Sequence, residues 1–206
     1  MTDLIQSYTA RFNNELKPAA VGLASFLEDT FGNEDSVCFI RTRAKSIDRF
    51  MQKAERKEAG QPRYADPINQ VQDQVGGLIV TRFVSDVERL KERVEESFTG
   101  IEKQHLEPES ESEFGYIGDH FILFLPLEVT SEVPDYSGPD FFELQIKTLF
   151  QYAWSETNHA IGYERPEELN RDQRRMTAYI AAQAWGADKA VDELNIALQK
   201  ESKSNA

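Results

Sequence analysis

The chain has 206 residues, of which 40% are hydrophobic, and a formal net charge of −13. This length suits one globular domain with an appended helix better than two full domains. The negative charge argues against a general nucleic-acid coat protein and against a membrane-surface protein, because both depend on positive fields. It requires that the few cations gather wherever a phosphate ligand binds.

The single cysteine, Cys38, allows no intrachain disulfide and fits a reducing, cytoplasmic environment. The N-terminal residues carry charges where a signal peptide needs an apolar run. The longest apolar stretch, residues 121–127, is too short to cross a bilayer, so no membrane partner is expected. With three histidines and one cysteine in the chain, a dense zinc cluster is not expected either.

Hydrophobic periodicity and capping patterns predict helices that alternate with strands along the chain. In chain order the expected elements are a helix over residues 3–30, a strand over 36–42, a helix over 44–58, a strand over 78–83 opened by Gly76 and Gly77, a helix from Ser85, a strand over 118–127, a strand over 141–147, a helix from Thr148 to Tyr163, and a last helix from Asn170. Ser85, Thr148 and Asn170 each precede a Glu or Gln by three residues, which is a capping pattern.

This order predicts an α+β fold, with a mixed β-sheet flanked by helices and a long C-terminal helix. We divide the chain into an N-terminal helix (residues 1–33), a core (34–165) and a C-terminal helix with a frayed tail (166–206). Apolar side chains recur three or four residues apart along the last helix, at Met176, Ile180, Ala184, Ala187, Val191, Leu194 and Leu198. Such a stripe either packs on the body of the domain or forms a seam between copies in a homo-oligomer.

The strand over residues 141–148 (FFELQIKT) has the most informative polar face. Period-two alternation places Glu143, Gln145 and Lys147 on one face and apolar side chains on the other. The strand leads into a helix, whose first amide groups favour anions. The pattern predicts either a phosphate-handling site or a plain amphipathic strand with a solvated face.

Asp73 is a second carboxylate, placed just before the glycine pair at 76 and 77. Magnesium in proteins commonly uses one or two carboxylates together with phosphate oxygens. If the fold brings Asp73 and Glu143 together, the two predict a Mg²⁺ site. Alone, Asp73 would be an ordinary turn or cap residue.

Cations gather around the start of the helix expected over residues 44–58. Lys45, Arg49 and Lys53 lie four residues apart and share one ridge. Arg41 and Arg43 precede them and share one side of the preceding strand. In a chain this acidic, the five cations predict a triphosphate site, with a solvated helix face as the alternative.

Two further segments combine aromatic side chains with histidine. Tyr116 lies next to a glycine in GYIGDH and could stack on a base, while His120 could donate to a phosphate or ribose oxygen. On the following helix, His159 shares a face with Tyr152 and Glu156. The simpler interpretation is a packed tyrosine in a turn, and a helix surface with a Glu–His pair.

The order and types of these segments resemble a known family. The segments RAKSIDRFMQK (43–53), DQVGGLIV (73–80), FGYIGDH (114–120), FELQIKT (142–148) and AWSETNHAIGY (153–163) resemble the synthetase domain of the RelA/SpoT family. The chain is most similar to its stand-alone members, the small alarmone synthetases, of which it looks like a divergent member. The resemblance covers roughly residues 36–165 and implies a nucleotidyltransferase-like synthetase fold.

The same resemblance implies a pyrophosphokinase that uses Mg²⁺ to move the β,γ-pyrophosphate of ATP to the 3′-hydroxyl of GDP or GTP, giving (p)ppGpp in the stringent response. The residues that would bind ATP are Arg43, Lys45, Arg49 and Lys53. Asp73 and Glu143 would hold the metal, and Glu143 would also orient or deprotonate the acceptor hydroxyl. The residues that would lie against the acceptor nucleotide are Tyr116, His120, Gln145, Lys147, Asn158 and His159.

Several positions depart from the family pattern. The departures are Leu78 and Lys147, where the pattern has arginine, and Arg49 and Gly118, where it has serine. Arg82 shares the strand parity of Leu78 but lies about 13 Å farther along an extended strand. The acidic run over residues 107–113 (EPESESE) would repel a polyphosphate nucleotide that enters from its side.

Three functions therefore stay open. The first is an alarmone synthetase. The second is a related, toxin-like transferase whose acceptor is an adenine nucleotide or a tRNA 3′ end, although the acidic composition disfavours tRNA. The third is a nucleotide-binding regulatory module that keeps the fold without the reaction, which Leu78 and the acidic run favour.

Overall fold

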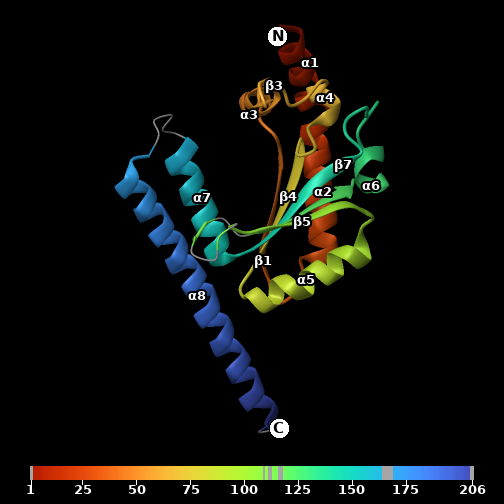
Figure 1. Ribbon diagram of the computed structural model, residues 1–206. Coiled ribbons are helices and arrows are strands. Elements are labelled where there is room, and N and C mark those ends of the chain that lie inside the picture. Colours follow the sequence, from red (N-terminus) through yellow and green to blue (C-terminus); the bar gives the residue numbers. More distant parts are fainter. Residues whose placement is uncertain (1, 109, 111–112, 116–117, 164–168, 205–206) are drawn as a thin grey trace.

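The computed structural model describes residues 2–108, 110, 113–115, 118–163 and 169–204. It confirms the expected α+β fold, in which a five-stranded mixed sheet is flanked by helices (Figure 1). The strand order across the sheet is β1 (Val37–Ala44), β4 (Val75–Thr81), β7 (Phe141–Thr148), β6 (Gly118–Phe124) and β5 (Gly100–Leu106). Neighbouring strands are antiparallel except for β4 and β7, which are parallel. The division of the chain at residues 33 and 165 stays a prediction.

The helix expected over residues 3–30 is present, with a π-helical segment in its middle. It consists of α1 (Thr2–Arg11), η1 (Phe12–Leu16) and α2 (Lys17–Phe31). Pro18 stands in the first turn of α2 and has no backbone N–H to continue the α-helical hydrogen bonds. The backbone N–H of Lys17 bonds the carbonyl of Phe12, five residues back, so the chain widens by one residue just before the proline.

Six further helices and one short hairpin complete the described part of the chain. They are α3 (Ile47–Ala54), the hairpin of β2 (Lys57–Glu58) and β3 (Gln61–Pro62), α4 (Pro67–Gln70), α5 (Val84–Ser97), α6 (Leu127–Ser131), α7 (Leu149–Tyr163) and α8 (Arg171–Ser204). Two capping predictions are confirmed: Thr148 and Gln151 exchange side-chain-to-backbone hydrogen bonds at 3.0 Å, and Asn170 and Gln173 do the same at 2.8 and 3.0 Å.

Several expected boundaries are wrong, for local reasons. The helix expected over residues 44–58 is shorter, because Ala44 still belongs to β1 and the chain turns at Ala59 and Gly60, which both have positive φ. Gly76 and Gly77 lie inside β4 instead of opening it. Ser85 does not cap α5; its hydroxyl instead donates to Asp192 of α8 at 2.7 Å.

The two faces of the sheet differ sharply in chemistry. One face packs on α2 and α5 and forms the core, with Leu27, Phe142 and Leu144 wholly buried. A Cβ at Gly77 would lie 3.0 Å from a methyl group of Leu27 and 3.0 Å from one of Leu144. The sequence therefore has glycine where α2 comes closest to the sheet. The opposite face carries the polar side chains of β7, as the alternation predicted.

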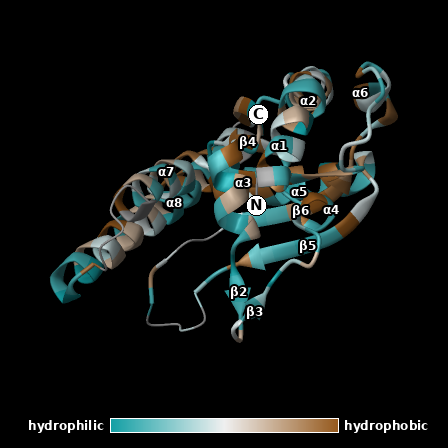
Figure 2. Ribbon diagram, turned by 90° about the horizontal axis from the view of Figure 1, so that it is seen from above, coloured by the Kyte–Doolittle hydropathy of each residue, from teal (hydrophilic) through white to brown (hydrophobic). Residues whose placement is uncertain are grey.

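The C-terminal helix α8 lies along α7 and extends beyond the body of the domain (Figures 1 and 2). The predicted apolar stripe packs on the body only in part: Ile180, Ala184 and Ala187 are half-buried. The remaining members of the stripe are exposed: Met176 (59%), Val191 (38%), Leu194 (60%) and Leu198 (54%). No helix within the described residues is long and apolar enough to cross a membrane.

Candidate active site

Asp73 forms a carboxylate–lysine cluster at the entrance to β4. Its two oxygens lie 2.7 Å from Nζ of Lys45 and 3.0 Å from Nζ of Lys53. Lys45 directly follows β1, where its backbone N–H donates to the carbonyl of Gln74 at 2.8 Å, and Lys53 comes from α3. Two lysines from separate elements thus converge on one carboxylate. Lys45 precedes α3, so the predicted ridge of Lys45, Arg49 and Lys53 along a single helix is wrong at Lys45.

The charged groups in this cluster shift one another's pKa values. Burial alone would raise the pKa of Asp73, but the ammonium groups of Lys45 and Lys53 outweigh it and hold the pKa below its ordinary value. Burial lowers the pKa of Lys45, and the charge of Asp73 offsets only part of that effect. At neutral pH the carboxylate is ionised, and the lysines are available to a phosphate that competes with it.

Glu143 is the second predicted carboxylate, and it is fixed by two neighbours. Nδ1 of His120 lies 3.0 Å from one oxygen, and Nε2 of Gln145 donates to the other at 2.8 Å. In the strand register His120 of β6 stands opposite Gln145 of β7, so Glu143, two residues from Gln145 on the same face, is the diagonal neighbour of His120. Burial raises the pKa of Glu143, but hydrogen bonding to His120 and its charge outweigh burial, so the net shift is downward. The negative charge of Asp73 tends to raise the pKa of Glu143, so the two carboxylates interact electrostatically.

Arg43 lies over Gly76, in the same row of the sheet as Glu143. In the sheet it stands opposite Gly76, which in turn stands opposite Glu143. A Cβ at Gly76 would be 3.9 Å from the side chain of Arg43, so the guanidinium-bearing chain crosses over this glycine. The positive charge of Arg43 helps to lower the pKa of Lys45, Lys147 and His159.

Helix α7 supplies further polar groups to the site. Arg49 of α3 donates to Nε2 of His159 at 2.6 Å, which joins α3 to α7 and requires a neutral imidazole, since arginine cannot accept. Burial, followed by the charge of Arg49, lowers the pKa of His159 in agreement with this. Lys147 donates to Ser155 of α7 at 3.1 Å, and burial lowers its pKa to about 8. Asn158 is half-buried on the same helix.

The structure thus brings together most residues that the sequence predicted for the site. Tyr116, predicted to stack on the acceptor base, lies outside the described residues, as do residues 109, 111 and 112 of the acidic run. Arg82 lies past the end of β4 and donates to the carbonyl of Asp35, so it does not fill the place of Leu78. The sequence missed a contact between Arg41 and Tyr152, whose only sequence signal is the strand parity that Arg41 shares with Arg43.

Asp73 and Glu143 fit a magnesium ion that arrives with a nucleotide. Both are ionised at neutral pH and lie close enough to influence each other. Among the described residues, no group of three or more His, Cys, Asp or Glu side chains could hold a metal by itself. A two-carboxylate site completed by phosphate oxygens is the usual arrangement for Mg²⁺. Such an ion, when bound, would neutralise phosphate charge beside the lysines.

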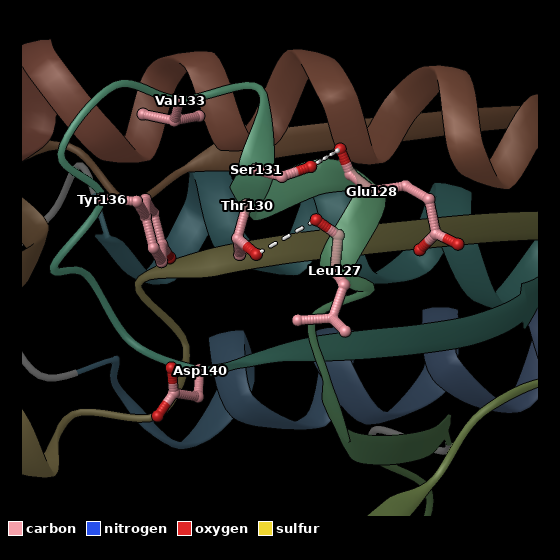
Figure 3. A pocket seen from close by; sticks show the side chains of 7 residues that line it. All are labelled: Leu127, Glu128, Thr130, Ser131, Val133, Tyr136 and Asp140. Atoms are coloured by element: carbon pink, nitrogen blue, oxygen red, sulfur yellow. Dashed lines mark hydrogen bonds between the residues drawn. The ribbon is translucent and has the colours of Figure 1, made fainter.

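An open hollow in the described structure lies elsewhere. It has a volume of about 670 Å³ and is lined by Leu127, Glu128, Thr130, Ser131, Val133, Tyr136 and Asp140 (Figure 3). None of the residues described above lines it. Convergent charges, and not a cavity, therefore mark the candidate active site.

The sheet order, the carboxylate pair and the converging cations together make up the fold and its candidate site. The chain belongs to the RelA/SpoT family: residues 42–168 match the family model described as a region found in RelA / SpoT proteins. A search of curated protein sequences gave no match.

Solved structures of small alarmone synthetases share the fold. Small alarmone synthetase 1 from Bacillus subtilis, bound to its product pppGpp, superposes with a TM-score of 0.74 at 24% identity, over 92% of this chain and 97% of that one. A GTP pyrophosphokinase family protein from Streptococcus pneumoniae gives 0.71 at 17% identity, over 95% of each chain. Small alarmone synthetase 2 from Bacillus subtilis gives 0.65 at 19% identity, over 92% of this chain and 99% of that one. At these identities the similarity establishes the fold.

Proposed function

We propose that the protein is a magnesium-dependent pyrophosphokinase that moves the β,γ-pyrophosphate of ATP to the 3′-hydroxyl of GDP or GTP. The observation that carries the proposal is Glu143, an ionised carboxylate fixed by His120 and Gln145 beside the cations that surround Asp73. Membership of the RelA/SpoT family supports it. So does the likeness to small alarmone synthetase 1, whose structures hold pppGpp and, separately, AMPCPP.

The reaction assigns each group a task. The acceptor 3′-oxygen forms a bond to the β-phosphorus of ATP, the bond between that phosphorus and the α,β-bridging oxygen breaks, and AMP leaves. The hydroxyl proton passes to Glu143. Because the pKa of Glu143 lies below its ordinary value, the carboxylate mainly orients the hydroxyl and takes the proton only as the new O–P bond forms.

The cations neutralise the transferred group and the leaving phosphate. Lys45 and Lys53 exchange Asp73 for phosphate oxygens when ATP binds, and Arg43, which lies over Gly76 in the same row as Glu143, adds a third cation. Preorganised charge of this kind is the main protein contribution to phosphoryl-type transfer. His120 and Gln145 hold Glu143, and Lys147 and His159 give the acceptor side positive and hydrogen-bonding groups.

A nucleotide-binding regulatory module without transfer activity is the second candidate. The observation that favours it is Leu78, which stands on the site face between Arg41 of β1 and Gln145 of β7, where the family pattern has arginine. A transferase with an adenine nucleotide or tRNA as acceptor is a third outcome of the same test.

The deciding experiment measures transfer of label. The protein is incubated with Mg²⁺ and ATP labelled at the γ-phosphate, with GDP, GTP, ATP and tRNA as parallel acceptors. Label on GDP or GTP supports the proposal. Label transferred to the 3′-hydroxyl of an adenine nucleotide or of tRNA supports a related transferase. Nucleotide binding without transfer supports the regulatory module.

The first prediction concerns Glu143. Replacing Glu143→Gln removes the proton acceptor while keeping the size and the hydrogen-bonding shape of the side chain. We expect kcat to fall by about 10²-fold or more, the usual contribution of a positioned acid or base. Glu128→Gln is the matched control, because Glu128 is an exposed carboxylate of α6. If Glu143→Gln transferred label as fast as the wild type, the assignment of the active site would be wrong.

A further inference from the structure

Arg41 is held rigidly on the site face of the sheet by two aromatic residues. Its Nη1 donates to the hydroxyl of Tyr152 at 2.7 Å. Its guanidinium carbon lies 4.9 Å from the ring centre of Phe39 and 5.7 Å from that of Tyr152. The two rings themselves meet edge to face at 5.2 Å. The residue is nevertheless exposed, so a planar cation is fixed in place while it stays accessible to a ligand.

The strand register places Arg41 beside the centre of the site. In one row across the sheet, Arg41 of β1 stands opposite Leu78 of β4, Leu78 opposite Gln145 of β7, and Gln145 opposite His120 of β6. Side chains in such a row share a face. Leu78 is half-buried, so it offers a small apolar surface between a guanidinium on one side and the acceptor-side polar groups on the other.

Arg41 lies along the same strand as the groups assigned to the donor phosphates. Arg43 is two residues farther along β1, and Lys45 directly follows the strand. Four residues of extended chain span about 13 Å, so Arg41 is too far from Lys45 to share one phosphate with it. A nucleotide whose phosphates lie at Lys45 and Lys53 would extend its nucleoside back along β1, towards Arg43 and Arg41.

We propose that Arg41, oriented by Phe39 and Tyr152, binds the nucleoside of the donor nucleotide, with its purine base resting on Leu78. This inference rests on the proposed function for the identity of the donor. A guanidinium suits the role because it can stack on a base and can donate two parallel hydrogen bonds to its acceptor atoms. Arg41 has five N–H donors, of which the contact with Tyr152 uses one. Tyr152 acts as a positioning residue for Arg41.

The arrangement also accounts for Leu78 in a site that otherwise keeps its charges. An arginine at position 78 would stand next to both Arg41 and Arg43, and three guanidinium groups would then crowd one small area. With leucine at position 78, the guanidinium that contacts the base is that of Arg41, which comes from β1 instead of β4. The edge position of β1 leaves Arg41 open on its outer side.

The second prediction compares a nucleotide with a probe that has no nucleoside. Binding of AMPCPP and of inorganic tripolyphosphate, each with Mg²⁺, is measured by calorimetry. We expect Arg41→Met to weaken AMPCPP binding by about tenfold, in the range of one good contact to a base, and to leave tripolyphosphate binding nearly unchanged. Arg41→Lys should restore little, because lysine keeps the charge but loses the planar fork. Tyr152→Phe should weaken AMPCPP binding about two- to fivefold, because it removes a single hydrogen bond that orients Arg41.

The matched control is Arg82→Met, which removes an exposed arginine just beyond β4 that donates to a backbone carbonyl. It should leave the binding of both probes unchanged. An equal loss of affinity for AMPCPP and tripolyphosphate in Arg41→Met would overturn the inference, since the residue would then act on phosphates. Unchanged AMPCPP binding in both Arg41→Met and Arg41→Lys, with the thermal unfolding temperature lowered, would also overturn it and leave Arg41 with a role in docking α7 only.

These outcomes are separate from those of the proposed function. A protein that binds AMPCPP through Arg41 but transfers no label would contradict the proposed function while the inference stands. A protein that transfers label to GDP or GTP with the same KM for ATP in Arg41→Met would contradict the inference while the proposed function stands.

Discussion

Lys147 keeps the positive charge of the arginine in the family pattern but loses its proton at a much lower pH than arginine would. The family pattern has arginine at this position, and arginine stays protonated at any physiological pH. Lys147 is buried on the site face and donates to Ser155, and burial lowers its pKa to about 8. Its positive charge is therefore lost only slightly above neutral pH, whereas an arginine in the same place would keep it.

The third prediction follows from this pKa. We expect kcat/KM for the acceptor nucleotide to fall as pH rises through about 8, because the ammonium group that the proposed function assigns to the acceptor loses its proton. In an unfolded chain lysine keeps its proton until about pH 10.4. Between about pH 8 and about pH 10.4 the unfolded state therefore binds more protons than the folded state. The free energy of unfolding rises with pH over this range. Activity and stability should thus move in opposite directions, which separates a loss of charge from unfolding.

Lys147→Arg is the matched variant for this pH profile. It should move the alkaline fall in kcat/KM upward by at least one pH unit, because the guanidinium does not titrate in this range. A profile that is the same in the wild type and in Lys147→Arg would assign the alkaline limb to another group.

At the scale of elements, hydrogen bonds accepted by Asp188 and Asp192 attach α8 to β7 and to α5. Thr148, at the end of β7, donates to Asp188 at 2.8 Å, and Ser85 of α5 donates to Asp192 at 2.7 Å. Asp188 is only 5% exposed, and burial raises its pKa to about 6. At neutral pH Asp188 is ionised, and the burial of its charge destabilises this attachment. The hydrogen bond from Thr148 offsets only part of that cost.

The fourth prediction is that Asp188→Asn stabilises the protein at pH 8 but has little effect at pH 4. A raised carboxyl pKa means that the folded state holds a proton that the unfolded state, with a pKa near 3.9, has already lost. Stability is therefore lost as pH rises between about 4 and 6, and the whole cost is present above that range. Asparagine stays neutral and can still accept from Thr148. We expect the thermal unfolding temperature to rise by about 2–4 °C at pH 8.

Asp192→Asn is the control for this helix attachment. Asp192 accepts from both the backbone N–H and the hydroxyl of Ser85, so its replacement removes charge from two good hydrogen bonds. We expect no stabilisation at pH 8. A gain of equal size in both variants would point to a general relief of negative charge on α8 instead of to burial at Asp188.

At the scale of the whole molecule, the outer part of α8 presents an unusual apolar surface. Its exposed side chains include Tyr179, Val191, Leu194, Ile196 and Leu198, in a chain with a net charge of −13. Exposed apolar side chains that gather on one helix are typical of surfaces that bind another protein. The sequence offered two interpretations of this stripe, and the outer half does not pack on the body of the domain.

The fifth prediction is that the chain associates with itself through this part of α8. Sedimentation velocity at rising protein concentration should show a mass above that of one chain. Leu194→Glu combined with Leu198→Glu should lower that mass, because it places two further charges on an apolar surface of an already acidic protein. Gln199→Glu, which adds a charge at an exposed polar position of the same helix, should have little effect. A single-chain mass for the wild type at every concentration would contradict the prediction.

Local patterns determined much of this structure in advance. The alternation in residues 141–148 determined that Glu143 and Gln145 share a face, because neighbouring side chains on a strand point to opposite sides. The capping patterns at Thr148 and Asn170 determined where α7 and α8 begin, because the hydrogen bonds involved join residues three apart. In contrast, β5 was missed: it is exposed along its whole length, so it carries no alternation of apolar and polar residues (Figure 2).

Contacts between distant segments were decided only by the tertiary structure. The sequence named Asp73, Lys45 and Lys53 but gave no reason for two lysines to converge on one carboxylate, because that depends on how α3 follows β1 and faces the turn before β4. Arg41 stands beside Leu78 because of the β1–β4 register, and it meets Tyr152 because α7 folds back over the sheet. The alternation of side chains along a strand and the capping of a helix depend on interactions within a few residues. Strand register and helix docking depend on packing across the whole core. The sequence by itself therefore named most of the candidate side chains, and the tertiary structure decided which of them act on one another.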